Sequence, residues 1–548
     1  MGADSLDRRD LFRIGVTAGV TALAGGALAG CQGSGTKQPT LGTKGEPALP
    51  APDLAEVTIA ELQARMTTGA ETCVSLVAKY TARIEAVNEA GPNLRAVIEL
   101  DPDAAAKAHQ LDAERAAGKL RGPLHGIPLL VKDNLDTGDK MPTTGGSLAL
   151  AGTHAKQDSF VVAKLRAAGA LILGKSNLSE WANLRGAASV SGWSARGGQC
   201  KNPYALDRSP SGSSSGSGAA VAANLCAAAI GTETDGSITS PASCNSLVGL
   251  KPTVGLVSRS GIIPIAASQD TAGPMARTVS DAAILLTAIA GTDPNDPATK
   301  LAKPEDYTKY LDRDALKGAR IGVPRKGWFG INRNMDAIAE VALHELARLG
   351  AVIVDPVVLD SPPALGLAEL EVLLYEIKWL LADYLATRGA DTKVRTLADV
   401  IAFNKDHAVE LSVFGQELFE HAQAKGPLTD KAYVDARATC LRIARDEGLD
   451  RVFAAHNLDA IFAGTGSPPW LIDPVNGDAS GASCSTLPAI AGYPHITVPA
   501  GFVHGLPMGI SLIGPAWSEG KLLGYAFAYE QATKLRRAPK YLATALDV

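Results

Sequence analysis

The sequence Ser209-Pro-Ser-Gly-Ser-Ser-Ser-Gly-Ser-Gly218 leads into a predicted helix that begins at Ala219 and is rich in small residues. A second small-residue stretch, Gly231-Thr-Glu-Thr-Asp-Gly-Ser237, follows an apolar run that ends at Ile230. Taken alone, the second stretch would be an ordinary surface turn. The serine-rich first stretch could be a flexible linker, but a linker is seldom followed at once by a packed helix and a strand. Together the stretches predict loops in which the backbone comes close to other backbone or to a ligand.

Upstream of both loops, the apolar segment Gly126–Lys132 is predicted to be a strand that ends in a charged residue. A lysine that loses its water there has a lowered pKa, so its neutral amine can act as a base. Strand alternation directs the neighbouring Asp133 to the opposite face of the sheet, so this carboxylate need not neutralise Lys132. The sequence thus offers a candidate base and two serine-bearing loops.

Helical and strand patterns alternate on both sides of this segment, which is typical of a mostly parallel sheet covered by helices. Asp158 is the predicted N-cap of the helix over 159–168. Residues 365–445 are predicted to be helices that line or cover a pocket. The other predicted strands are 97–100, 170–173, 319–323, 351–354, 459–463, 495–498 and 508–513, and the other helical stretches are 54–87, 335–349 and 519–535.

Length and composition exclude several classes of protein. The chain has 548 residues, of which 46% are hydrophobic and 20% charged, so it is neither disordered, nor collagen-like, nor a multi-span membrane protein. The net charge is −5 and no basic stripe occurs, so nucleic acid is not an expected partner. Nine histidines without zinc-ligand spacing indicate no metal, and seven cysteines are too few for a disulfide scaffold. Cys226 and Cys244 are expected to be buried free thiols.

The first thirty residues have the pattern of an export signal. Arg8-Arg9 precedes an uncharged segment rich in Ala and Gly, which resembles a twin-arginine signal and is too short and too polar to span a bilayer well. Leu28-Ala-Gly-Cys31 resembles a bacterial lipobox, in which Cys31 is lipidated. We therefore expect residues 1–30 to be removed and residues 31–52 to form a flexible tether. The expected protein is exported, in the periplasm or at the cell surface, and contacts the membrane only through a lipid at Cys31.

Two motif matches point to other chemistries. Gly169–Ser176 satisfies the phosphate-loop pattern, but a predicted helix precedes Gly169 and an apolar strand occupies the loop. Gly212-Ser-Ser-Ser-Gly216 matches the nucleophile elbow of α/β-hydrolases. An elbow needs a strand directly before it, and residues 201–210 contain two prolines and predict none. An esterase that uses Ser214 with a histidine stays open as an alternative.

The ordered motifs resemble those of the amidase signature family, over roughly residues 55–535. The resemblance implies one α/β domain over residues 53–548, with a mixed, mostly parallel central sheet covered by helices on both faces. Length alone would suggest three or four domains. Besides the two loops, the motifs are Leu124-His-Gly-Ile-Pro-Leu-Leu-Val-Lys132-Asp-Asn, Gly174-Lys-Ser-Asn-Leu-Ser-Glu180, Ala491–Gly501 and Leu506–Gly514.

The resemblance also implies the catalytic residues. The Ser–cis-Ser–Lys triad of the family falls on Ser237, Ser213 and Lys132, and Ser213 lies 24 residues before Ser237, as the family pattern expects. Ser237 attacks the amide carbonyl, and Ser213 relays the proton to neutral Lys132 and later to the leaving amine. The expected enzyme hydrolyses a carboxamide C–N bond through a serine acyl-enzyme and needs no cofactor. The implied oxyanion hole consists of the backbone N–H groups of Thr234, Asp235, Gly236 and Ser237.

Two departures from the family pattern fall in the catalytic loops. The usual Gly-Gly-Ser-Ser-Gly-Gly core is replaced by Ser211–Gly216, within which the resemblance implies a cis peptide bond between Gly212 and Ser213. Asp235 stands where a Gly-Gly pair is more common. Neither departure removes an atom of the triad, but both alter the residues that shape the loops.

The expected substrate is a small amide or a peptide amide. Thr239 stands where relatives that take small acidic substrates often carry arginine, so a free acid is not the expected substrate. Residues 192–204 and 469–478 are similar to stretches of bacterial peptide amidases, which release ammonia from C-terminal peptide amides; simple packing of Trp193 and Trp470 is the alternative. The resemblance also allows an amidotransferase component, which the export signal disfavours, or a non-catalytic exported binding lipoprotein, which the intact triad disfavours.

Overall fold

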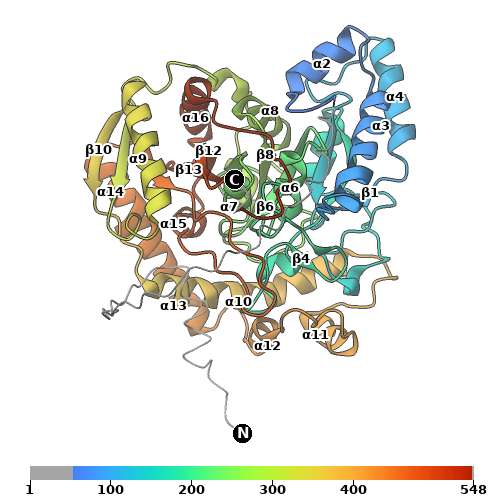
Figure 1. Cartoon of the computed structure of the whole chain (residues 1–548). Coiled ribbons are helices and arrows are strands. Elements are labelled where there is room, and N and C mark those ends of the chain that lie inside the picture. Colours follow the sequence, from blue (N-terminus) through green and yellow to red (C-terminus); the bar gives the residue numbers. More distant parts are fainter. Residues whose placement is uncertain (1–52, 546–548) are drawn as a thin grey trace, which may run out of the picture.

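The apolar runs of the sequence form one 11-stranded sheet in the computed structural model, which describes residues 53–545. The strand order is β1-β3-β2-β6-β8-β7-β12-β13-β11-β9-β10, and Figure 1 shows β1 and β10 on opposite sides of the molecule. The strands are β1 (Val97–Leu100), β2 (Pro128–Lys132), β3 (Leu171–Ser176), β6 (Ala228–Glu233), β7 (Val248–Lys251), β8 (Thr271–Ala276), β9 (Arg320–Pro324), β10 (Val352–Val357), β11 (Ala460–Gly464), β12 (His495–Val503) and β13 (Leu506–Ile513).

The sheet is mixed, as expected, but the prediction that it is mostly parallel is wrong. Of its ten pairings, β2–β3, β2–β6, β9–β10 and β9–β11 are parallel, and the other six are antiparallel. The C-terminal strands show the physical reason, because only His504 and Gly505 connect β12 to β13. Both residues have positive φ, as a tight hairpin turn requires, and so short a connection permits only an antiparallel pair.

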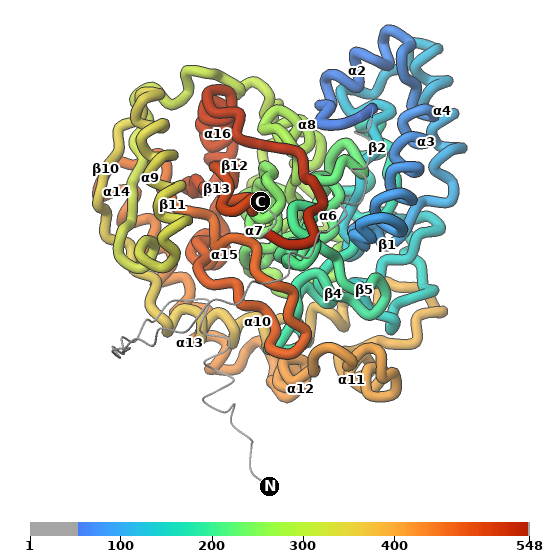
Figure 2. Tube along the Cα trace, in the orientation of Figure 1, coloured from blue at the N-terminus to red at the C-terminus, as the bar shows by residue number. Residues whose placement is uncertain are grey.

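Helices flank this sheet, and four of them form a separate group. Figure 2 shows that group gathered along one side of the molecule; it begins two residues before the region 365–445 that the sequence predicts to be helical. The group consists of α10 (Pro363–Thr387), α11 (Leu397–Asp406), α12 (Glu417–Gln423) and α13 (Lys431–Leu441). The other helices are α2 (Ile59–Thr67), α3 (Cys73–Ile84), α4 (Ala104–Ala116), α5 (Phe160–Ala167), α6 (Ser215–Ala222), α7 (Thr239–Cys244), α8 (Val279–Ile289), α9 (Arg333–Arg348), α14 (Asp450–His456), α15 (Thr486–Ala491) and α16 (Glu519–Thr533).

The N-cap of α5 differs from the prediction. Ser159, not Asp158, caps this helix, because the Ser159 hydroxyl accepts a hydrogen bond from the Val162 N–H at 3.3 Å. The Asp158 carboxylate instead accepts a hydrogen bond from the Gly138 N–H at 2.7 Å. Ser159 therefore caps the helix, and the adjacent Asp158 instead anchors the neighbouring loop at Gly138.

The main core cluster draws on residues from Leu54 to Tyr529, and the described residues form one domain rather than the three or four that length suggests. Its six cysteines, among them Cys226 and Cys244, are all buried and free, as predicted for those two. No helix in the described part of the chain combines the length and the apolar character that a bilayer crossing needs. The predicted signal (1–30), the tether (31–52) and Cys31 lie outside the described residues.

Helix α6 is buried along its whole length, which explains its small residues. A Cβ atom on Gly216 would lie 2.2 Å from the Ala96 carbonyl oxygen and 2.5 Å from that of Asn177. Backbone atoms cannot yield to such contacts, so only glycine fits at this position. The small residues let α6 sit deep in the molecule, and its N-terminus carries the serine-rich loop into the core.

Candidate functional site

Lys132 ends β2 and has no exposed surface. Its Nζ donates hydrogen bonds to Ser213 Oγ at 2.7 Å and to Thr232 Oγ1 at 2.9 Å. Burial lowers the pKa of Lys132 from 10.5 to about 7, although the carboxylates of Asp270 and Glu233 oppose part of this change. A substantial fraction of Lys132 is therefore neutral near pH 7 and can accept a proton from the hydroxyl that it contacts.

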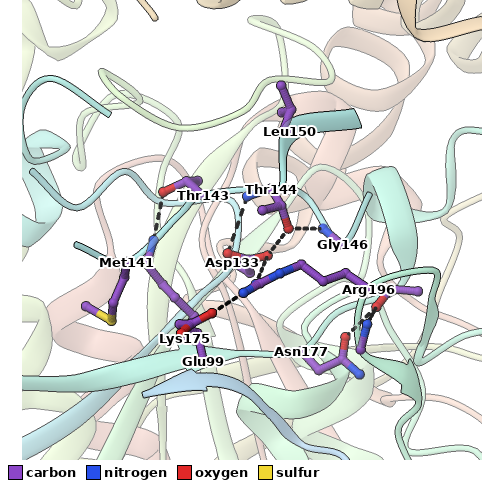
Figure 3. Close-up of polar contacts among 12 residues, drawn as sticks. Glu99, Asp133, Met141, Thr143, Thr144, Gly146, Leu150, Lys175, Asn177 and Arg196 are labelled. Atoms are coloured by element: carbon purple, nitrogen blue, oxygen red, sulfur yellow. Dashed lines mark hydrogen bonds and ion pairs between the residues drawn. The ribbon is translucent and has the colours of Figure 1, made fainter. Parts of the chain in front are cut away.

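Asp133 faces away from Lys132, as strand alternation predicts. Its carboxylate accepts a hydrogen bond from the Thr144 hydroxyl and lies 3.6 Å from an Arg196 nitrogen, while Arg196 also pairs with Glu99 (Figure 3). Among the described residues Lys132 itself forms no ion pair. The two neighbours in sequence thus occupy separate polar environments, and the base is left without a carboxylate in direct contact.

Ser213 lies in the turn that precedes α6. The peptide bond between Gly212 and Ser213 is cis, as the resemblance implies, and the Ser213 carbonyl accepts a hydrogen bond from the Ser179 N–H at 3.1 Å. A Cβ atom on Gly212 would lie 2.2 Å from the Ser179 hydroxyl, so a side chain has no room there. The turn places the Ser213 hydroxyl, which has no exposed surface, directly on the Lys132 amine.

Ser237 lies in the loop between β6 and α7, and it is 8% exposed. Its carbonyl accepts a hydrogen bond from the Ser214 N–H at 3.2 Å, which joins the two serine-bearing loops. The Ser237 hydroxyl donates no hydrogen bond to, and accepts none from, the rest of the described chain. The structure therefore places the Ser213 hydroxyl on the Lys132 amine and joins the Ser237 loop to the Ser213 loop through the backbone, while the Ser237 hydroxyl itself is unengaged.

The backbone N–H groups of residues 234–237 are also unengaged, since none donates a hydrogen bond to another group within residues 53–545. Gly236 has a positive φ of 73°, which bends this loop. The next two N–H groups, of Ile238 and Thr239, donate to the Glu233 carboxylate at 2.8 and 3.0 Å. The Glu233 side chain thus anchors the start of α7 and leaves four consecutive donors before it. Such a run of free N–H groups can stabilise a developing oxyanion.

A cavity of about 520 Å³ opens onto this site. Ser213, Thr232 and Thr234 lie in its wall, but Asp235, Gly236 and Ser237 are not among its lining residues. The loop 262–265 supplies apolar lining, and α10 adds Leu380, Asp383, Tyr384 and Thr387. The lining also holds three carboxyl groups and one guanidinium, which are Asp270, Asp296, Asp383 and Arg259.

The charged groups of the cavity leave an excess of negative charge. Arg259 donates a hydrogen bond to the Asp296 carboxylate at 2.9 Å, so this cation is already neutralised. Asp383 is exposed, and it forms no ion pair with another described residue. Burial raises the pKa of Asp270 to about 6, although the Thr234 hydroxyl donates to its carboxylate at 2.5 Å. The cavity therefore favours a neutral or cationic molecule over an anion. Across residues 53–545, no group of three His, Cys, Asp or Glu side chains is arranged to hold a metal ion.

Neither competing motif has the geometry that its chemistry needs. Ser214 is fully buried, and its hydroxyl bonds to the backbone carbonyl and N–H of Thr232 at 3.0 and 3.2 Å. No histidine of the described chain contacts it, so the esterase alternative is not favoured. Gly169–Ser176 contains the buried strand β3, in which the Lys175 amine donates to the Thr143 hydroxyl at 2.8 Å.

The two stretches that contain Trp193 and Trp470 are linked to each other rather than to the cavity. Trp193 packs edge-on against Phe414, at 5.3 Å between ring centroids. The Trp470 indole donates a hydrogen bond to Asp478 at 2.9 Å, and Asp478 also accepts the Ser191 N–H at 3.1 Å. These contacts favour the packing interpretation for both tryptophans, since neither lines the cavity.

Sequence reasoning missed several residues that shape the site. Thr232 and Glu233 belong to the second small-residue stretch, yet nothing in their spacing shows that one binds Lys132 and the other anchors the loop. Asn134, which donates to the Thr232 hydroxyl at 3.0 Å, follows the predicted base by two residues. The wall formed by α10 carries no local signal, because only the fold brings residues 380–387 to this cavity.

Comparisons with known proteins agree with this geometry. Residues 75–523 match the family model described as Amidase. The solved structure of peptide amidase from Stenotrophomonas maltophilia is 53% identical, with a TM-score of 0.85, and the match covers 89% of this chain and 99% of that one. A probable amidase of Arabidopsis thaliana is 42% identical over 89% of this chain and 92% of its own length. A component of the glutamyl-tRNA(Gln) amidotransferase of Chloroflexus aurantiacus is 35% identical over 88% and 98%. The chain therefore belongs to the amidase family and is an amide-hydrolysing enzyme.

Proposed function

We propose that this enzyme releases ammonia from the C-terminal amide of peptides, with Ser237 as nucleophile, Ser213 as proton relay and Lys132 as base. The observation that carries the proposal is the 2.7 Å hydrogen bond from the buried Lys132 amine to the Ser213 hydroxyl, beside a loop with four free N–H groups. A serine hydroxyl both donates and accepts hydrogen bonds, so Ser213 can occupy the middle of a relay.

The reaction begins when Ser237 Oγ attacks the amide carbon and its proton passes through Ser213 to neutral Lys132. The carbonyl oxygen becomes an oxyanion, which the N–H groups of residues 234–237 stabilise. Lys132 then returns the proton through Ser213 to the leaving nitrogen, the C–N bond breaks, and ammonia departs. Water attacks the remaining ester by the same relay, which frees the peptide carboxylate and restores Ser237.

Similarity to the peptide amidase supports the substrate class, and so does the charge of the cavity. A C-terminal amide is neutral, whereas the product is a carboxylate that the Asp270 and Asp383 side chains repel. The single guanidinium of the lining, Arg259, is occupied by Asp296 and offers the product no free cation. An uncharged amide can therefore enter the cavity, and electrostatic repulsion favours release of the carboxylate product.

The test is ammonia release from a panel of peptide amides, aryl amides and fatty amides. Wild type should hydrolyse peptide amides, and Ser237→Ala should lose at least about 10⁴-fold in kcat, as removal of a nucleophile does. A fluorophosphonate should label wild type on Ser237, with Ser214 in the same digest as the internal control. Full activity of Ser237→Ala would overturn the assignment of the nucleophile. Activity on aryl or fatty amides alone would reject only the peptide substrate.

We further propose that residues 1–30 direct export and that Cys31 carries a lipid anchor, at the periplasmic or cell-surface side of a membrane. The support is the twin arginine at Arg8-Arg9 and the Leu28–Cys31 lipobox. Membrane fractionation tests the anchor: wild type should sediment with membranes, whereas Cys31→Ala should be released. Identical fractionation of the two proteins would contradict the anchor. Retention of Arg8→Lys/Arg9→Lys inside the cell would support the export route.

A further inference from the structure

Asp235, the residue that departs from the family pattern, connects the 234–237 loop to two other parts of the fold. One carboxylate oxygen, Oδ2, accepts a hydrogen bond from the Thr486 hydroxyl of α15 at 2.8 Å. The other oxygen, Oδ1, is buried and accepts no hydrogen bond from the described chain. Two further side chains lie within hydrogen-bonding reach of the Asp235 carboxylate, the Ser485 hydroxyl and the carboxyl of Glu369 in α10.

Gln269 holds the Glu369 side chain in place and also contacts the 234–237 loop. The Gln269 side-chain nitrogen donates to Glu369 Oε1 at 2.7 Å and to the Thr234 carbonyl at 3.3 Å. Glu369 is only 8% exposed, so these partners carry most of its polar contacts. Helix α10 therefore reaches the 234–237 loop twice, through Gln269 to Thr234 and through Glu369 to Asp235.

Two facing carboxyl groups in this setting cannot both be charged. Burial, together with the repulsion of Asp235, holds the pKa of Glu369 well above its usual range, and burial also raises that of Asp235. The other charged groups that face Asp235 act in opposite directions: Lys251 of β7 favours its ionised form, and Glu233 of β6 opposes it. Two thiols also lie near the pair, that of Cys440 in α13 near Glu369 and that of Cys484 near Asp235. Glu369 is therefore the member of the pair that holds a proton more firmly.

We propose that Glu369 is a positioning residue, which as a neutral carboxylic acid donates a hydrogen bond to Asp235 Oδ1 and so fixes the loop that supplies the oxyanion hole. This inference rests on the proposed function, because it assigns Glu369 to the same loop. It supplies a donor to an oxygen that accepts no hydrogen bond from the described chain, and it gives a reason why an aspartate can replace glycine at this position. Glu369 does not line the cavity, so it acts on the reaction only through the loop.

The test compares Glu369→Gln with Glu369→Leu. Glutamine keeps the size of the side chain, accepts from Gln269 and donates to Asp235, so kcat at pH 7 should stay within about threefold of wild type. Leucine provides no donor, and kcat should fall by about 100-fold with little change in KM, because the loop and not the cavity wall is disturbed. In wild type, kcat should fall on the alkaline side as the shared proton is lost; in Glu369→Gln this decline should be absent, because an amide does not titrate.

Three results would overturn the proposal: a fully active Glu369→Leu, a Glu369→Gln as inactive as Glu369→Leu, or an unchanged alkaline decline in Glu369→Gln. Thermal melting of each variant identifies loss of folding, and Asp235→Asn provides a second route to the same question. Asparagine keeps an acceptor for Glu369 and removes the repulsion that raises its pKa, so in this variant the alkaline decline should begin at a lower pH than in wild type. Ser237→Ala separates the two proposals: if it stays active, the proposed function fails, and if only the Glu369 variants behave like wild type, this inference alone fails.

Discussion

Three lysines are fully buried within residues 53–545, and their surroundings explain why only one of them is suited to act as the base. The Lys175 amine bonds to the Leu135 carbonyl and the Thr143 hydroxyl, away from the cavity. Lys251 lies near the carboxylates of Glu233 and Glu519. Of the three, only Lys132 bonds to hydroxyls that line the cavity, those of Ser213 and Thr232. Burial lowers the pKa of all three, but only Lys132 can pass a proton towards a bound substrate.

The pH dependence of the enzyme should follow Lys132. Because the neutral amine is the active form and its pKa is about 7, kcat/KM should rise with pH through neutrality, before the alkaline decline expected from Glu369 sets in. Lys132→Arg keeps a positive charge at every accessible pH and should lose at least about 100-fold in kcat/KM throughout. Initial rates on an uncharged peptide amide measure both effects. A wild-type profile that is flat between about pH 5 and 9 would exclude Lys132 as the base.

At the scale of elements, α6 shows packing overriding helix propensity. Alanine is the better helix former by about 1 kcal/mol, yet Gly216→Ala should destabilise the protein, because its Cβ would lie 2.2 Å from the Ala96 carbonyl oxygen. Since the turn before α6 carries Ser213, amidase activity should fall as well. Thermal melting and kcat measure the two effects.

The matched control for this prediction is Gly366→Ala in α10. No atom lies within 4 Å of the Cβ that this substitution would add. It should therefore stabilise the protein by up to about 1 kcal/mol and leave kcat unchanged. Equal stabilisation by Gly216→Ala and Gly366→Ala would contradict the close packing of α6.

The local sequence pattern predicts the strands and helices of this fold better than it predicts which strands pair and in which direction. The strand predicted over 97–100 is β1 with the same bounds, since four apolar or alternating residues carry that signal by themselves. The direction of pairing depends on connections such as His504–Gly505, so the parallel character of the sheet was overestimated. Likewise, the motifs placed Lys132, Ser213 and Ser237 in order, but Glu369 reaches the loop only through the packing of α10. No sequence spacing encodes a contact between positions 134 residues apart.

At the scale of the whole molecule, the C-terminal hairpin lies in the middle of the sheet rather than at its edge. Strand β12 pairs with β7 on one side and with β13 on the other, and β7 follows the catalytic loop by way of α7. Glu519, at the start of α16, accepts a hydrogen bond from the Thr253 N–H at 2.6 Å. The C-terminal region therefore completes the sheet that bears the site, and no boundary divides the two.

Such a continuous sheet predicts that the enzyme unfolds as one unit. Ile496 of β12 is 1% exposed and pairs with Leu250 and Leu512, so Ile496→Ala should cost about 2–5 kcal/mol. Its effect should appear as a single calorimetric transition at lower temperature, with activity lost in that same transition and kcat near wild type below it. If the C-terminal region were a separate domain, Ile496→Ala would split the transition, and activity would persist after the first part unfolds. Activity should be lost in the single transition because the site spans β2, β6 and the loops that β7 and β12 hold in place. Calorimetry and residual activity measured along the same temperature ramp distinguish these outcomes.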